Sequence, residues 1–412
     1  MTFISKKQTR FIPRKVYHQL KKHLAQPEIS LILGPRQAGK TTLMLKLADE
    51  LTKKGTPNTY FNLDVIEDKE HFQTQHSLLE AVAKRVGKAK KIVVFIDEIH
   101  RLENAGLFLK GLYDLNTGHK FVVSGSGSLE LRADIIEPMT GRKKIFYCMP
   151  LAFGEFFSFK VKTDTKQERE RLIREYLSYG GYPRVVTAVT NEEKLSVLAE
   201  IFRSYLEKDI QLLLKVEKGE SFSLLVRLLA EQVGKIVNRA ELSSTLGVTE
   251  RTLEKYFYLL EKTFVTSLVK PFFTNVRKEL RKSPKVYFND LGLLNFSRGY
   301  FQQDQPPIKG DVFENACFLR LKELDLFEEI KFWRSSSGAE VDFVVNHPKL
   351  GKNIPIEVKL NPQKRKISRS LISFIKNYQP RTAIFYTLKE KGTTERLNTK
   401  IIFLPYEEKI AV

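Results

Sequence analysis

Leu31-Ile-Leu-Gly34-Pro-Arg-Gln-Ala-Gly39-Lys40-Thr41-Thr42 is the segment that sets the architecture of the first 160 residues. It matches the P-loop pattern, in which two glycines enclose four residues and a lysine and a serine or threonine follow. An apolar, strand-like run over Ile29–Leu33 precedes the loop, and a helical pattern over residues 40–54 follows it. This order turns backbone N–H groups and the positive end of a helix toward phosphate oxygens. The segment therefore predicts a nucleotide site rather than an ordinary glycine-rich turn.

The residues of this loop have different expected roles. Lys40 would reach the β- and γ-phosphates of ATP, and the hydroxyl of Thr41 would complete the shell of a Mg²⁺ ion. The remaining expected contacts to the nucleotide come from the loop backbone and the start of the helix: Gly34, Pro35, Arg36, Gln37, Ala38, Gly39 and Thr42. ATP and Mg²⁺ are therefore the predicted cofactors.

A second element of the site is the apolar run Ile92–Ile96, which ends in Asp97 and Glu98. Asp97 is placed to hold Mg²⁺ through water, and Glu98 to polarise the attacking water as a general base. An Asp–Glu pair after a strand can also be a solvated strand end. Its position downstream of a P-loop favours the catalytic interpretation.

A third strand, over Lys120–Ser124, ends in hydroxyl groups. Ser124 and Ser126 are candidates for a polar sensor of the γ-phosphate, with ordinary turn residues as the alternative. Arg132 and Arg142 follow, and Arg142 is the stronger candidate for an arginine finger, acting in cis or on a neighbouring subunit. Surface arginines are common, so that role stays open, as does a homo-oligomer.

The rhythm of strands and helices predicts an α/β fold with a mostly parallel sheet, a P-loop NTPase domain over residues 1–160. Residues 161–300 are mainly helical and residues 301–412 alternate again between strands and helices. Within the middle region, helical patterns over residues 238–247 and 249–262 have the spacing of a helix-turn-helix. The second helix offers Thr249, Glu250, Arg251 and Lys255 to DNA, but its apolar face equally suits a winged-helix-like packing module.

Several motifs together resemble a prokaryotic AAA-type ATPase family whose members carry a conserved C-terminal domain of uncharacterised function. Besides the loop, they are Phe95-Ile-Asp-Glu-Ile99, Val123-Ser-Gly-Ser-Gly-Ser128, Thr140-Gly-Arg142, Leu151-Ala-Phe-Gly-Glu-Phe156, Tyr179-Gly-Gly-Tyr-Pro183 and Phe288-Asn-Asp-Leu-Gly-Leu293. The resemblance covers nearly the whole chain. It implies ATPase activity and an association with DNA transactions or defence, without a known substrate.

The C-terminal region carries charged residues inside apolar strand patterns. Asp342 lies in one such strand, Glu357 and Lys359 in the next, and Glu314 on the preceding helix. This layout predicts a restriction-endonuclease-like domain in which Glu314, Asp342 and Glu357 hold Mg²⁺ and Lys359 stabilises developing charge. The alternative is an internal ion pair in a nuclease-like fold that does not cut.

Composition narrows the partners. With 69 Lys and Arg against 48 Asp and Glu, the net charge is +21, which favours polyanions such as nucleic acid or an anionic membrane face. DNA is expected in preference to RNA, in line with the DNA transactions that the resemblance implies. The two cysteines form neither a disulfide framework nor a metal-ligand spacing. No signal peptide or membrane-length apolar run is evident, which predicts a cytoplasmic protein without membrane partners. The preferred reading is an ATPase coupled to a nuclease-like domain; the alternative is a nucleotide-dependent switch or scaffold that binds protein or DNA without cutting.

Overall fold

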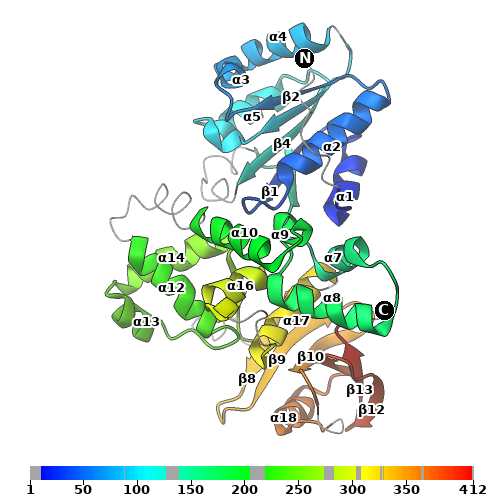
Figure 1. Cartoon of the computed structure of the whole chain (residues 1–412), viewed down its shortest axis with the longest axis vertical. Coiled ribbons are helices and arrows are strands. Elements are labelled where there is room, and N and C mark those ends of the chain that lie inside the picture. The colour runs from blue at the N-terminus through cyan, green and yellow to red at the C-terminus, as the bar shows by residue number, and fades with distance from the viewer. Residues whose placement is uncertain are drawn as a thin grey trace. The chain divides into compact units, whose positions relative to one another are not determined.

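The computed structural model describes residues 11–87, 89–126, 139–204, 219–272, 283–302, 308–324, 327, 329–362 and 366–410 (Figure 1). The chain divides into two compact units, Met1–Lys160 with Lys262–Phe264 and Val161–Glu261 with Val265–Val412. The helical region and the C-terminal region, which the sequence analysis treats as separate domains, therefore share the second unit. None of the helices in the described ranges is long and apolar enough to cross a membrane.

The first unit is built on a five-stranded parallel sheet in the order β2-β3-β4-β1-β5. Its strands are β1 (Ile29–Gly34), β2 (Asn58–Asn62), β3 (Val93–Asp97), β4 (Lys120–Ser126) and β5 (Lys143–Tyr147). The three central strands are buried along their whole length, as strands covered on both faces should be. Because all strands are parallel, their carboxyl ends meet at one edge. Gly34 pairs in register with Ser126 there, and Asp97 ends the next strand but one.

Helices cover both faces of this sheet. In the two apolar clusters on its faces, α1 (Lys15–His23) and α2 (Lys40–Lys53) pack on one side and α4 (Gln75–Val86) and α5 (Ala105–Asp114) on the other. The unit also contains α3 (Ile66–Lys69), α7 (Phe153–Lys160) and short 3-10 helices at Glu70–Phe72 and Ile99–Arg101. Alternate residues of β1 point to opposite faces. Ile32 packs with α1 and α2, whereas Leu31 and Leu33 pack with α4 and α5. The predicted parallel α/β domain is thus observed.

The second unit begins with helices and a short hairpin. These are α8 (Lys166–Tyr179), α9 (Pro183–Thr187), α10 (Asn191–Ser204), α12 (Gly219–Glu231), α13 (Arg239–Leu246), α14 (Glu250–Lys262), β6 (Thr266–Val269), β7 (Lys285–Phe288), α16 (Leu291–Ser297) and a 3-10 helix at Tyr300–Gln302. β6 and β7 pair antiparallel. The helix-turn-helix spacing appears as α13 and α14, joined through Gly247, which has φ 62°.

Two of the family-like motifs, at residues 179–183 and 288–293, pack against each other among these helices. Asp290 caps α16 by accepting a hydrogen bond from Leu293 N at 2.9 Å, and it also accepts one from Gly181 N at 2.7 Å. A Cβ at Gly180, where φ is 71°, would lie 2.4 Å from the Asp290 carboxylate, and one at Gly292 would lie 2.2 Å from Tyr179 O. Glycine is therefore required at both positions by close approach, and these motifs have a packing role.

The unit ends in a six-stranded mixed sheet in the order β12-β13-β11-β10-β9-β8. Its elements are α17 (Gly310–Leu324), β8 (Lys331–Arg334), β9 (Glu340–His347), β10 (Gly351–Lys359), α18 (Arg369–Tyr378), β11 (Thr382–Thr387), β12 (Gly392–Arg396) and β13 (Thr399–Pro405). β10, β11 and β13 run parallel, and the outer strands are antiparallel to their neighbours. α18 packs on an apolar cluster with Trp333 and Phe385, while Phe318 of α17 stacks on Tyr287 and Phe343.

Candidate functional site

Two glycines give the P-loop its shape. Gly39 has φ 97° and caps the start of α2, a backbone conformation that side chains disfavour. Gly34 is needed for another reason, since a Cβ there would lie 2.1 Å from the carbonyl oxygen of Cys148 on the next segment. The loop also turns at Gln37, where φ is 60°. The chain thus curls tightly between β1 and α2, with the amino end of α2 at its close.

Lys40 is the first residue of α2 and lies within the loop. Its Nζ donates hydrogen bonds to Gly34 O at 3.0 Å and Pro35 O at 2.8 Å, and the side chain is 6% exposed. Burial lowers the pKa of this ammonium, against the charges of Glu98 and Asp97, which raise it. A cation held by the carbonyls of the loop is placed where phosphate oxygens would meet it.

The Asp97 carboxylate accepts hydrogen bonds from four donor groups. Its Oδ2 accepts the hydroxyls of Thr41 at 2.7 Å and Tyr60 at 2.5 Å, and its Oδ1 accepts the Ser124 hydroxyl and Glu98 N. The carboxylate is 1% exposed. A buried carboxylate is stable only when it is hydrogen-bonded or paired with a cation, and three hydroxyl groups supply most of the hydrogen bonds to Asp97. The structure therefore brings together Thr41, Asp97 and Ser124, as the sequence predicts.

Glu98 follows in an unusual backbone conformation, with φ 57° and ψ 43°. For a residue other than glycine this costs on the order of 1 kcal/mol, and such strain concentrates at functional sites. Its Oε2 lies 3.0 Å from Nδ1 of His100. Burial raises the pKa of Glu98, but the neighbouring His100 and the charge of Lys40 outweigh burial and lower it overall. Glu98 is therefore ionised at neutral pH, the form that a general base requires.

These residues fit ATP and Mg²⁺. The Thr41 hydroxyl and the Asp97 carboxylate lie together and offer oxygen ligands, which Mg²⁺ prefers. Lys40 and the amino end of α2 offer positive charge to phosphates. Ser126, 2% exposed, ends β4 beside Gly34. The backbone of Pro35, Arg36 and Ala38 completes the loop, and Thr42 lies on α2.

Arg142 lies at the amino-terminal ends of the strands, opposite the P-loop, which lies at their carboxyl ends. Its carbonyl accepts a hydrogen bond from Ile29 N, at the start of β1, whereas the P-loop follows the end of that strand. A strand residue advances about 3.3 Å, so roughly 16 Å separates them. The Arg142 guanidinium instead pairs with Asp114 at 2.7 Å. This corrects the prediction of a finger in cis; a role in trans stays a prediction, and Arg132 lies outside the described residues.

Arg14, which belongs to no recognised sequence motif, is hydrogen-bonded to the backbone of the P-loop. It is 6% exposed and donates to Ala38 O at 3.2 Å, Met149 O at 2.5 Å and Glu155 Oε2 at 2.9 Å. One guanidinium thus joins the segment before α1, the P-loop and the turn before α7. Tyr60 is a second residue that sequence reasoning missed. A tyrosine alternating with buried residues on β2 was the signal available for it.

The predicted nuclease residues also lie in one region, but they bond to the protein. Glu314 Oε1 accepts the Tyr287 hydroxyl at 2.6 Å, Asp342 Oδ2 accepts Val358 N at 2.7 Å, and Glu357 Oε2 accepts the Ser368 hydroxyl at 2.6 Å. Burial raises the pKa of each of the three carboxyls. Lys359 is half exposed, 3.3 Å from Glu357 Oε1.

A buried lysine that the sequence analysis did not single out completes this centre. Lys285 is 1% exposed, and its Nζ lies 2.7 Å from Glu340 Oε1 and 3.4 Å from Glu314 Oε1. Although burial lowers the pKa of Lys285, the charges of Glu314, Asp342 and Glu340 raise it overall. Among the described residues, no three His, Cys, Asp or Glu side chains are placed to share a metal ion. One oxygen of each predicted ligand, Glu314, Asp342 and Glu357, thus accepts a hydrogen bond from the protein, and their role as metal ligands stays a prediction.

The helix-turn-helix surface is not strongly basic. The exposed side chains of α14 include Arg251 and Lys255 but also Glu250 and Glu254, and Glu254 pairs with Arg239 at 3.3 Å. Its other face, including Leu253 and Leu260, is buried in the unit. Phosphate contacts need a net positive surface, so this balance favours the packing alternative. The basic run at residues 277–282 lies outside the described residues.

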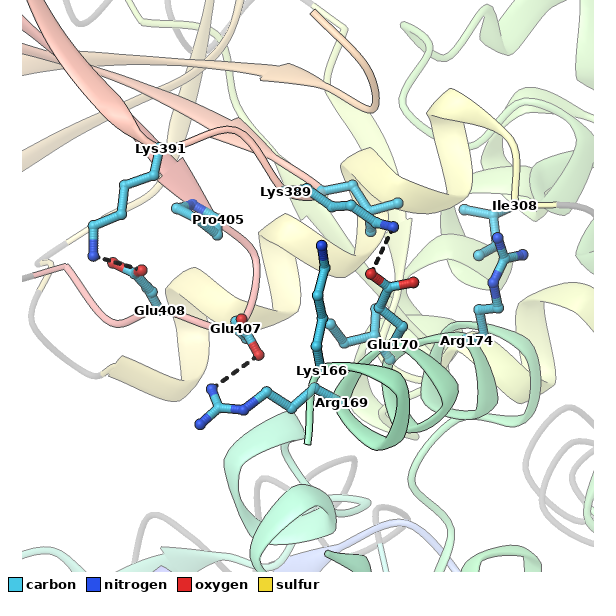
Figure 2. A pocket seen from close by; sticks show the side chains of 12 residues that line it. Lys166, Arg169, Glu170, Arg174, Ile308, Lys389, Lys391, Pro405, Glu407 and Glu408 are labelled. Carbon is cyan, nitrogen blue, oxygen red and sulfur yellow. Dashed lines mark hydrogen bonds and ion pairs between the residues drawn. The ribbon is translucent and has the colours of Figure 1, made fainter. Parts of the chain in front are cut away.

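A cavity of about 420 Å³ lies between α8 and the ends of the C-terminal strands (Figure 2). Ion pairs cross it between Arg169 and Glu407 at 3.3 Å and between Lys389 and Glu170 at 2.8 Å. These side chains are all more than a quarter exposed, and exposed pairs contribute little stability. The lining contains none of the predicted site residues.

Three family models match successive stretches of the chain. Residues 26–157 match an AAA domain, residues 170–304 a domain of unknown function (DUF8612) and residues 309–408 a domain of unknown function (DUF4143). The uncharacterized protein Rv2008c of Mycobacterium tuberculosis is 27% identical over 373 residues, which cover 89% of this chain and 78% of that protein. The uncharacterized protein MJ1544 of Methanocaldococcus jannaschii is 24% identical over 77% of this chain and 72% of its own length.

Solved structures include the replication initiator DnaA bound to AMPPCP and single-stranded DNA, at a TM-score of 0.33 and 14% identity over 61% of this chain and 90% of that one. Cdc6p from Pyrobaculum aerophilum has a TM-score of 0.31 and 11% identity over 77% and 97%. The family matches agree with the P-loop geometry and the parallel sheet of the first unit. The chain thus contains an AAA-type P-loop domain over residues 26–157 and, over residues 309–408, a C-terminal domain of unknown function.

Proposed function

We propose that this protein binds ATP with Mg²⁺ at the P-loop and hydrolyses it. The observation that supports this most directly is the convergence of Thr41 and Ser124 on Asp97, with Glu98 as the next residue. Phosphoryl transfer needs positioning and charge stabilisation more than covalent chemistry. A lysine inside the loop and a carboxylate pair at the end of the neighbouring strand supply both.

Each residue has a defined part in this proposal. Lys40 neutralises the β- and γ-phosphates, and Thr41 and Asp97 hold Mg²⁺, which supplies charge neutralisation when bound. Ser124 fixes the Asp97 carboxylate and the Glu98 backbone together, because its Oγ also accepts a hydrogen bond from Glu98 N at 3.2 Å. Glu98 accepts the proton of the attacking water.

Lys40→Ala tests the proposal. Steady-state ATP hydrolysis by the purified full chain should fall by on the order of 10²–10³-fold, as expected when one stabilising donor is removed. Lys53→Ala is the matched control, because Lys53 is an exposed lysine on the same helix that pairs only with Asp49 in the described contacts. Hydrolysis at the parental rate in Lys40→Ala, with nucleotide retained, would contradict the assignment.

We propose further that the nucleotide cycle gates binding of a nucleic acid, DNA in preference to RNA, by the second unit without cutting it. The net charge of +21 supports a polyanionic partner. The engaged carboxylates of Glu314 and Glu357 support binding over cleavage. Labelled duplex DNA should bind the wild type with an affinity that depends on ATP and falls steeply with salt. Equal binding with and without nucleotide would refute the gating.

Plasmid nicking in Mg²⁺ or Mn²⁺ separates binding from cleavage. The proposal expects no nicking by the wild type; nicking that Lys359→Ala abolishes would establish the nuclease instead. A homo-oligomer is also part of the proposal: Arg142 lies far from the P-loop of its own chain, so a role as arginine finger would require a neighbouring copy. Light scattering with and without nucleotide tests it. A cytoplasmic location completes the proposal and rests on the sequence alone.

A further inference from the structure

The acidic centre of the second unit contains its own cation. Lys285 begins β7, and its Nζ contacts Glu340 on β9 at 2.7 Å and Glu314 on α17 at 3.4 Å. The ammonium also lies 5.4 Å from the centre of the Phe332 ring. One buried side chain therefore connects the β6–β7 hairpin with the helix and a strand of the C-terminal sheet.

Burial makes this arrangement a mutual requirement. An ammonium with 1% exposure has lost its hydration and needs carboxylates around it. Glu314 and Asp342 are partly buried, and ionised carboxylates in such a place are stabilised by a nearby positive charge. Lys285 supplies one such charge from within the chain.

The same contacts work against a divalent ion. Mg²⁺ requires nearly octahedral oxygen ligands at about 2.0–2.1 Å. The Glu314 oxygen that faces Lys285 already accepts the Tyr287 hydroxyl at 2.6 Å, and Asp342 accepts a backbone N–H at 2.7 Å. A metal between these carboxylates would also lie close to the ammonium, and the two like charges would repel each other.

We propose that Lys285 is the resident cation of this centre, that the centre takes no divalent metal, and that it acts as an ionic joint between the hairpin and the C-terminal sheet. This inference concerns the second unit alone and is independent of ATP hydrolysis at the P-loop. Carboxylates arranged as in a nuclease site would then serve to hold the hairpin and the C-terminal sheet together.

Metal binding by the folded full chain tests the first part directly. Mn²⁺ is titrated into nucleotide-free protein carrying Lys40→Ala, and free Mn²⁺ is followed by electron paramagnetic resonance. We expect no site tighter than about 1 mM that Asp342→Asn removes. One equivalent of Mn²⁺ bound more tightly than this, and lost in Asp342→Asn, would overturn the proposal. This measurement stands whether or not any Lys285 variant can be isolated.

Substitution of the lysine tests the joint. Lys285→Met should lower the thermal midpoint of the second unit by several degrees, read from the fluorescence of Trp333, the single tryptophan of the chain. Mg²⁺ at about 10 mM should recover part of that loss, because the uncovered carboxylates then accept a cation. Lys389→Met, at the exposed partner of Glu170 in the same unit, is the control and should change neither the midpoint nor its response to Mg²⁺. A Lys285→Met midpoint equal to that of the wild type would refute the joint.

Discussion

The Tyr60 hydroxyl donates to Asp97 Oδ2 over 2.5 Å, and the Thr41 hydroxyl reaches the same oxygen over 2.7 Å. Tyr60 lies on β2, which pairs with β3 in parallel register. Burial and then the charge of Asp97 raise the pKa of the phenol, so Tyr60 stays protonated and donates at every physiological pH. The Asp97 carboxylate is thus hydrogen-bonded both to Tyr60 on the neighbouring strand and to Thr41 on the helix that follows the P-loop.

Tyr60→Phe should therefore disturb the orientation of Asp97 without emptying the core. A hydrogen bond to a charged group is worth about 1.5–3 kcal/mol, so we expect the hydrolysis rate to fall by on the order of tenfold. The Mg²⁺ concentration for half-maximal rate should rise as well. Rates at varied Mg²⁺ check both effects. Tyr147→Phe, at an exposed tyrosine on β5, is the control. Unchanged Mg²⁺ dependence in Tyr60→Phe would mean that the contact only fills space.

Glu98→Gln should separate binding from chemistry. Glutamine keeps the size of the side chain but accepts no proton, so turnover should fall by about 10²–10⁴-fold while ATP affinity stays near that of the wild type. Equilibrium binding of a fluorescent ATP analogue and single-turnover hydrolysis measure the two quantities. Glu103→Gln, at an exposed glutamate beyond the same strand, should behave like the parent. A Glu98→Gln rate within twofold of the parent would remove Glu98 from the role of base.

Arg14→Ala should destabilise the first unit. Truncation leaves Glu155, 16% exposed, without its partner and leaves the carbonyls of Ala38 and Met149 without this donor. Removing one member of a buried ion pair typically costs about 3–5 kcal/mol. Hydrogen exchange of β1 and β3 amides, read by mass spectrometry, measures the loss. Lys21→Ala breaks the exposed pair with Glu50 and should cost at most about 1 kcal/mol. Equal effects of the two variants would show that Arg14 is not a support of the loop.

The part of the site that the sequence predicts is the part that follows a strand directly. Lys40 and Asp97 lie next to strands whose carboxyl ends meet at one edge, so their proximity follows from a parallel sheet. The strands themselves were predictable because their interiors are continuously apolar. The sheet order, with β4 between β1 and β3, was not, since nothing local in a sequence specifies which strands are neighbours.

The remainder depends on contacts between distant segments. Arg14 meets Met149 and Glu155 more than a hundred positions along the chain, and Tyr60 meets Asp97 from another strand. Lys285 was not predicted as a site residue, because a lysine next to a basic stretch is typical of a solvent-exposed loop. Only the fold shows that this lysine is buried. Arg142 follows a glycine in a family-like motif, yet strand direction places it at the wrong edge for action in cis.

Asp290 should contribute to the pH dependence of stability of the second unit, beside the carboxyls of Glu314, Asp342 and Glu357. Burial raises the pKa of this carboxyl from 3.8 to about 6, although the N–H groups of Gly181 and Leu293 act in the opposite direction. Between these two values the native state retains a proton that the unfolded chain has lost. Rising pH therefore favours unfolding in this window, and above about pH 6 Asp290 is ionised in both states and its contribution ends.

Asp290→Asn tests that origin, because asparagine can still cap α16 through its side-chain oxygen but does not titrate. The free energy of unfolding of the wild type should fall relative to that of the variant by on the order of 2–3 kcal/mol from pH 4 to pH 6. Urea unfolding followed by Trp333 fluorescence at a series of pH values reports on this unit, and the slope against pH, not the absolute stability, is the quantity compared. Parallel slopes for the two proteins would assign the titration elsewhere. A steeper decline of stability with pH in the wild type than in the variant would show that Asp290, between Gly181 and α16, holds a proton in the folded state at acidic pH.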